Sequence, residues 1–368
     1  MATNKNQHFV PRCYLRPFTK DSENQAISLF NIDRETFIQN APVKNQCSRD
    51  YFYGKDEKLE AAIQFLESRY ALTLREVLSG SRKITDAHKS IIQKFWLFQH
   101  LRTEAASLRS VAMANEFSKG LGIEQSFRVE ISEAVQAAMN TFAKNMEAIS
   151  DLKVCLIKNN TSTPFITSDD PAILTNRWYI QNTKRIPFSF GVPSCGTLAI
   201  LPLSPEILFI GYDGDVYSIP KNTDGWATIR NDDDADAFNQ HQYLNCRANI
   251  FIKDPAHHPR IEESYHRTKT NRPEHRHKIN YAILDKEVGQ HKYYVVVDAK
   301  TARTHGEAIA HSMTIHPKPR NWPGVLQWRN KGKVYTNGTG AGYIRKAFIN
   351  SSTNPPFRKE PSFQKYKT

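Results

Sequence analysis

The order of the periodic stretches constrains the fold of this chain more than any other feature of its sequence. Apolar residues recur every three or four positions over residues 56–78, which predicts an amphipathic helix. A second helix is predicted from the N-cap residue Thr85 to beyond residue 113, and a third over 124–149. Short strand-like stretches then follow between residues 153 and 253. The sequence therefore predicts an α+β fold, in which a bundle of three long helices packs against a mixed or antiparallel sheet.

Positive charge is concentrated at the C-terminal end. The formal charge is +13, and residues 254–368 hold 21 basic but only 9 acidic side chains. Residues 254–278 are rich in Pro, His and charged groups, a composition typical of linkers. We therefore predict a core domain over 1–253, a Pro/His-rich linker over 254–278, and a small basic β-rich module with a flexible tail over 279–368. The excess charge indicates an acidic partner for residues 254–368, most commonly nucleic acid; a solvated basic surface is the alternative.

The composition excludes several protein classes. Hydrophobic residues make up 39% of the chain and aromatic residues 11%, which is enough for a packed core. The longest apolar stretch, residues 197–212, is interrupted by Pro202 and Pro205 and is too short to span a bilayer, so no membrane partner is predicted. The first residues lack the apolar segment of a signal peptide, and the five widely spaced cysteines form no CxxC pair. A cytoplasmic location with reduced thiols is expected.

Several motifs together resemble those of one protein family. The opening segment, residues 7–15, reads QHFVPRCYL. Later segments agree in order, namely Glu67, Gln99-His100-Leu101-Arg102-Thr103, Ile166-Thr167-Ser168-Asp169-Asp170-Pro171, Leu201-Pro202-Leu203-Ser204-Pro205 and Asn239. This pattern resembles the uncharacterised family known as domain of unknown function 4238, over about residues 7–253. The resemblance implies an architecture and a set of residues but no reaction. Where the family usually carries a basic and aromatic pair after Asn239, this chain has Ala248-Asn249.

Arg102 lies in the middle of the apolar stripe of the second predicted helix, near Phe95 and Phe98 on a helical wheel. A guanidinium on a buried face is costly unless a carboxylate meets it, and Glu67 and Asp169 are the candidates. Two interpretations remain open. The first is a structural ion pair, and the second is a polar pocket in which Arg102 clamps an anionic group such as a phosphate.

The candidate catalytic residues are His8, Glu67, Arg102 and Asp169, and Arg12 and Asn239 are expected near the same pocket. Asp169 follows an apolar strand and precedes a proline, which places a carboxylate at a sheet rim, although Ser-Asp-Asp-Pro is also common in turns. His8 is either a general base or metal ligand, or a capping histidine at the edge of the core.

An apolar strand in the basic region ends in Asp298-Ala299-Lys300, and Asp285 ends the strand before it. This arrangement resembles the carboxylate–strand–DxK pattern of restriction-type nucleases, in which two carboxylates hold Mg²⁺ and the lysine orients or activates water. Leu284 replaces the proline that usually precedes the first carboxylate. The candidate metal ligands are therefore Asp169, Asp285 and Asp298, with Mg²⁺ or Mn²⁺ as the ion. A plain hairpin is the alternative.

Aromatic and basic residues are interleaved further along the chain, a pattern that suits single-stranded nucleic acid because bases stack on rings and phosphates meet cations. The candidates are Arg320, Trp322, Trp328, Arg329, Lys331, Lys333, Arg345 and Lys346. A small β module whose aromatic residues form its own core is the alternative.

The sequence thus predicts a protein that acts on nucleic acid, in its simplest form a metal-dependent phosphodiesterase or nuclease with a basic C-terminal substrate-binding region. One alternative is a non-catalytic nucleic-acid-binding or interaction module. Another is a hydrolase or transferase that acts on a nucleotide-like small molecule in the Arg102 pocket.

Overall fold

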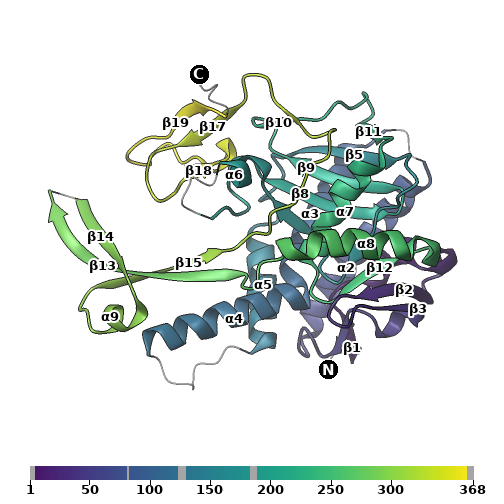
Figure 1. Cartoon of the computed structure of the whole chain (residues 1–368), viewed down its shortest axis with the longest axis horizontal. Helices are drawn as coiled ribbons and strands as arrows, with labels where there is room; N and C mark the ends of the chain where they lie inside the picture. Colours follow the sequence, from purple (N-terminus) through teal and green to yellow (C-terminus); the bar gives the residue numbers. More distant parts are fainter. Residues whose placement is uncertain (1–4, 81–82, 123–129, 183–188, 290, 363–368) are drawn as a thin grey trace.

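The computed structural model describes residues 5–80, 83–122, 130–182, 189–289 and 291–362, and it has the mixed α+β architecture that the sequence predicts (Figure 1). A five-stranded sheet lies in the middle of the body, in the order β11-β5-β9-β8-β7. Its strands are β5 (Lys153–Asn159), β7 (Ile173–Thr175), β8 (Leu198–Ser204), β9 (Ile207–Tyr212) and β11 (Trp226–Ile229). Only β11 and β5 run parallel, and β8 is buried along its whole length. This sheet therefore forms the centre of the core.

A second sheet is antiparallel and has the order β3-β2-β12-β6. It combines strands of the N-terminal segment with strands from much later in the chain. Its strands are β2 (Ala26–Asn31), β3 (Thr36–Pro42), β6 (Thr167–Ser168) and β12 (Asn249–Ile252). A short antiparallel pair, β1 (Asn6–His8) with β4 (Ser48–Asp50), lies nearby, and α1 (Arg12–Leu15) follows β1. Segments far apart in the sequence are thus brought together at β6 and β12.

Long helices pack against these sheets. They are α2 (Glu57–Leu78), α3 (Asp86–Arg102), α4 (Glu104–Leu121), α5 (Ile131–Lys144) and α7 (Asp232–Asn245); α6 (Arg177–Gln181) is short. The apolar stripe of α2 packs on α3, where the rings of Tyr70 and Phe95 stack with centroids 3.5 Å apart. Thr85 caps α3 as predicted, because its side chain accepts a hydrogen bond from the His88 amide at 3.2 Å.

The second predicted helix is in fact two helices, so the predicted bundle of three long helices needs correction. Thr103 has an extended backbone (φ −66°, ψ 157°) between α3 and α4. Its hydroxyl accepts a hydrogen bond from the Ala106 amide at 3.1 Å, which caps the start of a new helix. Apolar periodicity continues across the break, and the pattern alone therefore did not reveal it.

The segment predicted to be a linker, residues 254–278, contains α8 (His258–Thr268). Ile261 and Tyr265 of α8 are buried, in a cluster that includes Phe30 of β2 and Tyr243 of α7. The Pro- and His-rich composition concealed this apolar pair, which is spaced four residues apart on one helix face.

Residues after the predicted linker form two separate three-stranded sheets. The first, ordered β14-β13-β15, projects from the body with α9 as an arm (Figure 1). The second, ordered β18-β17-β19, packs on the body, where Val334 and Leu326 join the core of the five-stranded sheet. The elements are β13 (His277–Val288), β14 (His291–Val297), α9 (Ala299–Arg303), β15 (Ala308–Thr314), β17 (Lys333–Thr336), β18 (Tyr343–Ile344) and β19 (Arg358–Pro361), and β10 (Tyr217–Ser218) pairs with β16 (Gln327–Trp328).

None of the helices in the described part of the chain is long and apolar enough to cross a membrane.

Candidate functional site

Arg102 is completely buried and is paired with Glu67, as one of the two predicted pairings proposed. Its Nη1 lies 2.8 Å from Glu67 Oε1, and its Nε donates to the Phe9 carbonyl and to Gln99 Oε1, both at 3.1 Å. The guanidinium also lies 4.2 Å from the centre of the Phe98 ring. The last residue of α3 is therefore fixed by α2 and by the segment after β1.

His8 and Glu67 line one cavity of about 460 Å³ on the N-terminal side of the body. The Nδ1–H of His8 donates to the Gln46 carbonyl at 3.1 Å, which leaves Nε2 unprotonated in the neutral ring. Burial lowers the pKa of His8, and the positive charges of Arg12 and Arg102 add to this effect. The structure thus places His8 and Glu67 at one cavity, whereas the buried Arg102 is paired with Glu67 but does not line the cavity.

Asp169, the fourth candidate, does not line that cavity. Its carboxylate accepts three main-chain hydrogen bonds, from the amides of Arg247, Ala248 and Asn249, at 2.7–2.8 Å. Burial raises the pKa of Asp169 to about 6, whereas the three amide donors act in the opposite direction. Asp169 therefore holds the turn before β12.

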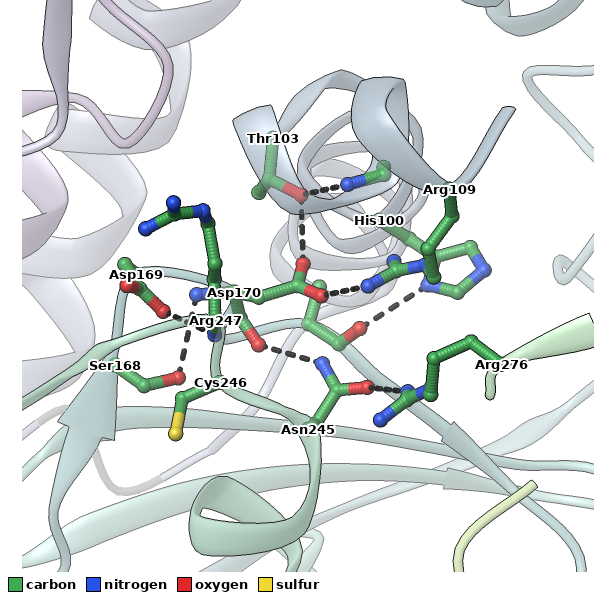
Figure 2. Close-up of polar contacts among 12 residues, drawn as sticks. His100, Thr103, Arg109, Ser168, Asp169, Asp170, Asn245, Cys246, Arg247 and Arg276 are labelled. Carbon is green, nitrogen blue, oxygen red and sulfur yellow. Dashed lines mark hydrogen bonds and ion pairs between the residues drawn. The ribbon is translucent and has the colours of Figure 1, made fainter. Parts of the chain in front are cut away.

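The neighbouring residue Asp170 occupies the position that the sequence analysis had given to Asp169, at a rim facing the helices (Figure 2). Its carboxylate accepts a hydrogen bond from Thr103 Oγ1 and pairs with Arg109 Nη1, both at 2.7 Å. Its main-chain carbonyl accepts from Asn245 Nδ2 at 2.8 Å, and Asn245 Oδ1 accepts from Arg276 Nη2 at 3.0 Å. We call these five residues the junction, because they connect α3, α4, α7 and the segment after β6.

A cavity of about 640 Å³, which we call the central cavity, lies beside the junction. Arg109, Asn245 and Arg276 contribute to its lining, together with His100 and residues of α4 and α5. Both motifs that meet here, around residues 99–103 and 166–171, are visible in the sequence, but Arg102 and Asp169 were the residues predicted from them. The signal for the junction was the second carboxylate of the Asp-Asp pair.

A third cavity is an open cleft of about 770 Å³, which lies at the start of β5 and the end of β9, near the start of α3. Four basic side chains line it, those of Lys89, Lys153, Lys221 and Arg329, and its described lining includes no acidic side chain. Asp86 pairs with Lys89 at 2.8 Å from outside this lining. The pKa of Lys221 is lowered, chiefly by partial burial, and the positive charges of Lys89 and Lys153 lower it further.

Lys333 and Lys359 extend this positive surface along β17 and β19. The pKa of Lys333 is lowered chiefly by the neighbouring Lys359 ammonium, and Arg329 contributes in the same direction. The basic strip is therefore defined as Lys89, Lys153, Lys221, Arg329, Lys333 and Lys359. Within this strip, the charges of Lys89 and Lys153 act unfavourably on the Lys221 ammonium, and those of Lys359 and Arg329 act unfavourably on the Lys333 ammonium.

A family model described as "Protein of unknown function (DUF4238)" matches residues 6–256, more than half of the chain. The chain belongs to this family. The match confirms the resemblance that the motifs indicated, and it includes Arg102 and most of the junction. No curated protein and no solved structure matches the chain.

The predicted nucleic-acid-binding residues all lie beyond the DUF4238 match, and the structure separates them. Arg329 and Lys333 belong to the basic strip, and Lys331 and Lys346 are exposed. Arg345, in contrast, is 2% exposed and is paired with Asp151, which corrects its assignment to a binding surface.

The predicted stacking aromatics are also engaged within the protein. Trp322 and Trp328 pack against the core of the five-stranded sheet, and the Arg177 guanidinium lies over both rings. Arg320 donates from its side chain to the Arg267 carbonyl at 2.8 Å. Both tryptophans are therefore half-buried and in contact with the protein, and their binding to bases stays a prediction.

The predicted metal ligands do not converge. Asp298 caps α9, since its carboxylate accepts from the amide and the hydroxyl of Thr301, and Asp285 is exposed at an irregularity in β13. Asp285 of β13 and Asp298 before α9 thus belong to the arm that projects from the body in Figure 1, whereas Asp169 directly follows β6. Within the described residues, no group of three or more His, Cys, Asp or Glu side chains is placed to hold a metal ion.

Proposed function

We propose that the protein binds nucleic acid along the basic strip. The observation that carries this proposal is the cleft of about 770 Å³ whose described lining has four basic and no acidic side chains. Lys89 is paired with Asp86, whereas Lys153, Lys221 and Arg329 form no ion pair among the described residues and are available to phosphates. The release of counterions from the nucleic acid drives such binding. The formal charge of +13 favours association with a polyanion.

The lowered pKa values in the basic strip support the same proposal. The positive charges of Lys89 and Lys153 lower the pKa of Lys221, and the positive charge of Lys359 lowers the pKa of Lys333. A phosphate placed between such ammonium groups removes part of this repulsion and adds an attraction. Because the tyrosines of the cleft, Tyr212 and Tyr217, are 3% and 1% exposed, recognition takes place through phosphates and not through base stacking.

Charge reversal in the cleft tests this proposal. The variant with Lys153→Glu, Lys221→Glu and Arg329→Glu should bind a short fluorescent oligonucleotide on the order of 100-fold more weakly in anisotropy titrations. The slope of log affinity against log salt should fall by about 3, one for each phosphate that the variant no longer neutralises. DNA and RNA should be affected alike, since phosphate contacts carry no sequence information.

A matched control has the same change in net charge at three exposed lysines of the N-terminal segment and α2, with Lys20→Glu, Lys44→Glu and Lys58→Glu. This control should lose less than about threefold in affinity. Equal losses in the two triple variants would show that overall charge, and not the cleft, determines binding, and would overturn the proposal.

Metal-dependent phosphodiester cleavage is an extension of this function that a separate assay tests. Wild-type protein is incubated with plasmid, single-stranded DNA and RNA in Mg²⁺ or Mn²⁺, with and without EDTA. Cleavage that EDTA abolishes, and that Asp169→Asn, Asp285→Asn or Asp298→Asn reduces, supports a phosphodiesterase. Binding without cleavage supports a non-catalytic nucleic-acid-binding protein.

A further inference from the structure

The central cavity is separate from the basic strip, with which it shares no lining residue. We propose that it is a binding site for a small organic phosphate, such as a nucleoside monophosphate, whose phosphate group is held by Arg109 and Arg276. The cavity, of about 640 Å³, lies between α4 and α5 on one side and β7, the end of α7 and the strands of the arm on the other. It is large enough for a ligand of this class.

The first argument is the balance of charge at the junction. Arg109 and Arg276 both lie close to Asp170, and Asp170 forms its ion pair with Arg109 alone. Two guanidinium groups thus lie near one carboxylate, which pairs with Arg109 and not with Arg276. Among the described residues, the acceptors of the Arg276 side chain are neutral, namely the Leu244 carbonyl at 2.9 Å and Asn245 Oδ1 at 3.0 Å. A ligand anion would supply the charge that this pair of arginines lacks.

The second argument is that Arg276 is held in place with part of its donor capacity unused. Its Nε is buried and has no hydrogen-bond partner among the described residues. Burial lowers the pKa of Arg276 to about 10, and the charge of Arg109 lowers it further. Arg276 caps the C-terminus of α7, and this role explains its two hydrogen bonds. The role does not explain why the Arg276 side chain also forms part of the cavity wall.

The third argument concerns two histidines that also line the cavity. The Nδ1–H of His100 donates to the Ala172 carbonyl at 3.1 Å, and the Nε2–H of His316 donates to the Phe190 carbonyl at 2.9 Å. The other ring nitrogen of each is therefore an acceptor while the ring is neutral. Burial lowers the pKa of His100, and it lowers that of His316 to about 3, which keeps both rings neutral near pH 7.

The chemistry of the ligand follows from these groups. Guanidinium groups select an anionic end, and the two histidine acceptors suit hydroxyl or N–H groups on the rest of the molecule. The remaining wall is largely apolar, with Leu101, Met113 and Leu174 among its side chains. It also includes the exposed carboxylate of Glu133, which accepts a hydrogen bond from the Glu130 amide at 3.0 Å at the start of α5. A phosphate joined to a hydroxyl-bearing and partly apolar body has all three properties.

Isothermal titration calorimetry on the full chain tests this site, with adenosine 5′-monophosphate, inorganic phosphate and adenosine as probes. The monophosphate should bind at least about tenfold more tightly than adenosine, because each charged hydrogen bond contributes to affinity. Arg276→Gln should weaken monophosphate binding by about tenfold or more. Monophosphate binding no tighter than adenosine binding would overturn the proposal.

Arg272→Gln is a matched control. Arg272 also donates to main-chain carbonyls at the end of α7, those of Tyr243 and Cys246, but it does not line the cavity. This variant should keep the wild-type affinity for the monophosphate. An equal loss in both variants would assign the effect to the end of α7 and contradict a phosphate site.

A second pair of variants avoids the arginines altogether, in case Arg276→Gln does not fold. Ala137 is exposed on α5 and lines the cavity, whereas Ala143 is exposed on the same helix and does not. Ala137→Trp should fill the entrance and weaken monophosphate binding at least about tenfold, and Ala143→Trp should leave it unchanged. Unchanged binding in Ala137→Trp would overturn the site. Neither variant should alter oligonucleotide binding, so this test is independent of the basic strip.

Discussion

Positive charge is compensated inside the protein at the buried arginines but much less so in the basic strip. Arg102 is completely buried beside Glu67, and Arg345 is 2% exposed beside Asp151, with two further hydrogen bonds to the Ala148 and Val192 carbonyls. In the cleft, by contrast, only Lys89 has an ion-pair partner among the described residues, Asp86, whereas Lys153, Lys221 and Arg329 have none. A cation that leaves water requires a partner inside the protein, whereas a cation at the surface does not. Matched charge therefore serves stability, and unmatched charge is available for a ligand.

The largest expected effect is a loss of stability when a buried arginine is replaced. Arg102→Ala should lower the free energy of unfolding by roughly 3–5 kcal/mol, because it leaves Glu67 without its partner and removes donors from the Phe9 carbonyl and Gln99. Glu67→Gln should cost less, roughly 1–2 kcal/mol, since this side chain is 24% exposed and an amide still accepts a hydrogen bond. Urea denaturation measures both values. A loss below about 1 kcal/mol for Arg102→Ala would contradict the argument from burial.

Arg345 and Arg329 provide a more discriminating test, because the sequence assigned the same role to both. Arg345→Gln should lower stability by about 3 kcal/mol and leave the oligonucleotide affinity of the folded protein unchanged. Arg329→Gln should change stability by less than about 0.5 kcal/mol and weaken oligonucleotide binding by about three- to tenfold. Urea denaturation and anisotropy titrations on the same samples measure stability and binding, and each variant should lose one property and keep the other. Weaker binding in a fully folded Arg345→Gln variant would remove the distinction between the two classes of cation.

The smallest expected effect is a pH dependence of binding. The pKa of Lys221 lies below its usual value, so this lysine begins to lose its charge at a lower pH than an ordinary lysine. A bound phosphate favours the protonated form, and affinity should therefore fall by about two- to threefold as the pH rises from about 7 to about 9. Lys221→Arg should reduce this decline, because arginine stays charged throughout the range. An identical decline in wild type and Lys221→Arg would show that Lys221 does not contact phosphate.

Elements with a clear local pattern were predicted well from the sequence. Helix α2 was predicted over residues 56–78 and is found over Glu57–Leu78, and the N-cap at Thr85 is confirmed. The burial of Arg102 and one of its two candidate partners also followed from the sequence, since its place in an apolar stripe required a carboxylate. These features depend on side chains within a few helical turns, and the spacing of apolar residues reports them directly.

Features that depend on contacts between distant segments were not predicted. The break at Thr103 is fixed partly by Asp170, 67 positions further along the chain. Which of the two carboxylates faces the helices depends on the start of β12. The amides of Arg247, Ala248 and Asn249 bind the Asp169 carboxylate, and Asp170 faces the helices instead. Neither contact has a local signature in the sequence, because it forms only when the two sheets and the helices are assembled.

The sequence by itself determined the α+β class, the family, the excess of positive charge and the need for a partner at Arg102. Composition and periodicity are sufficient for these, since they depend on how many apolar and charged groups there are and at what spacing. Only the tertiary structure decided which cations are matched. Arg329 and Arg345 lie in similar basic stretches of sequence, yet one is at the surface of a cleft and the other is beside Asp151, nearly 200 residues away in the chain. Burial and pairing are properties of the assembled fold, and they determine whether a charge stabilises the protein or is free to bind a ligand.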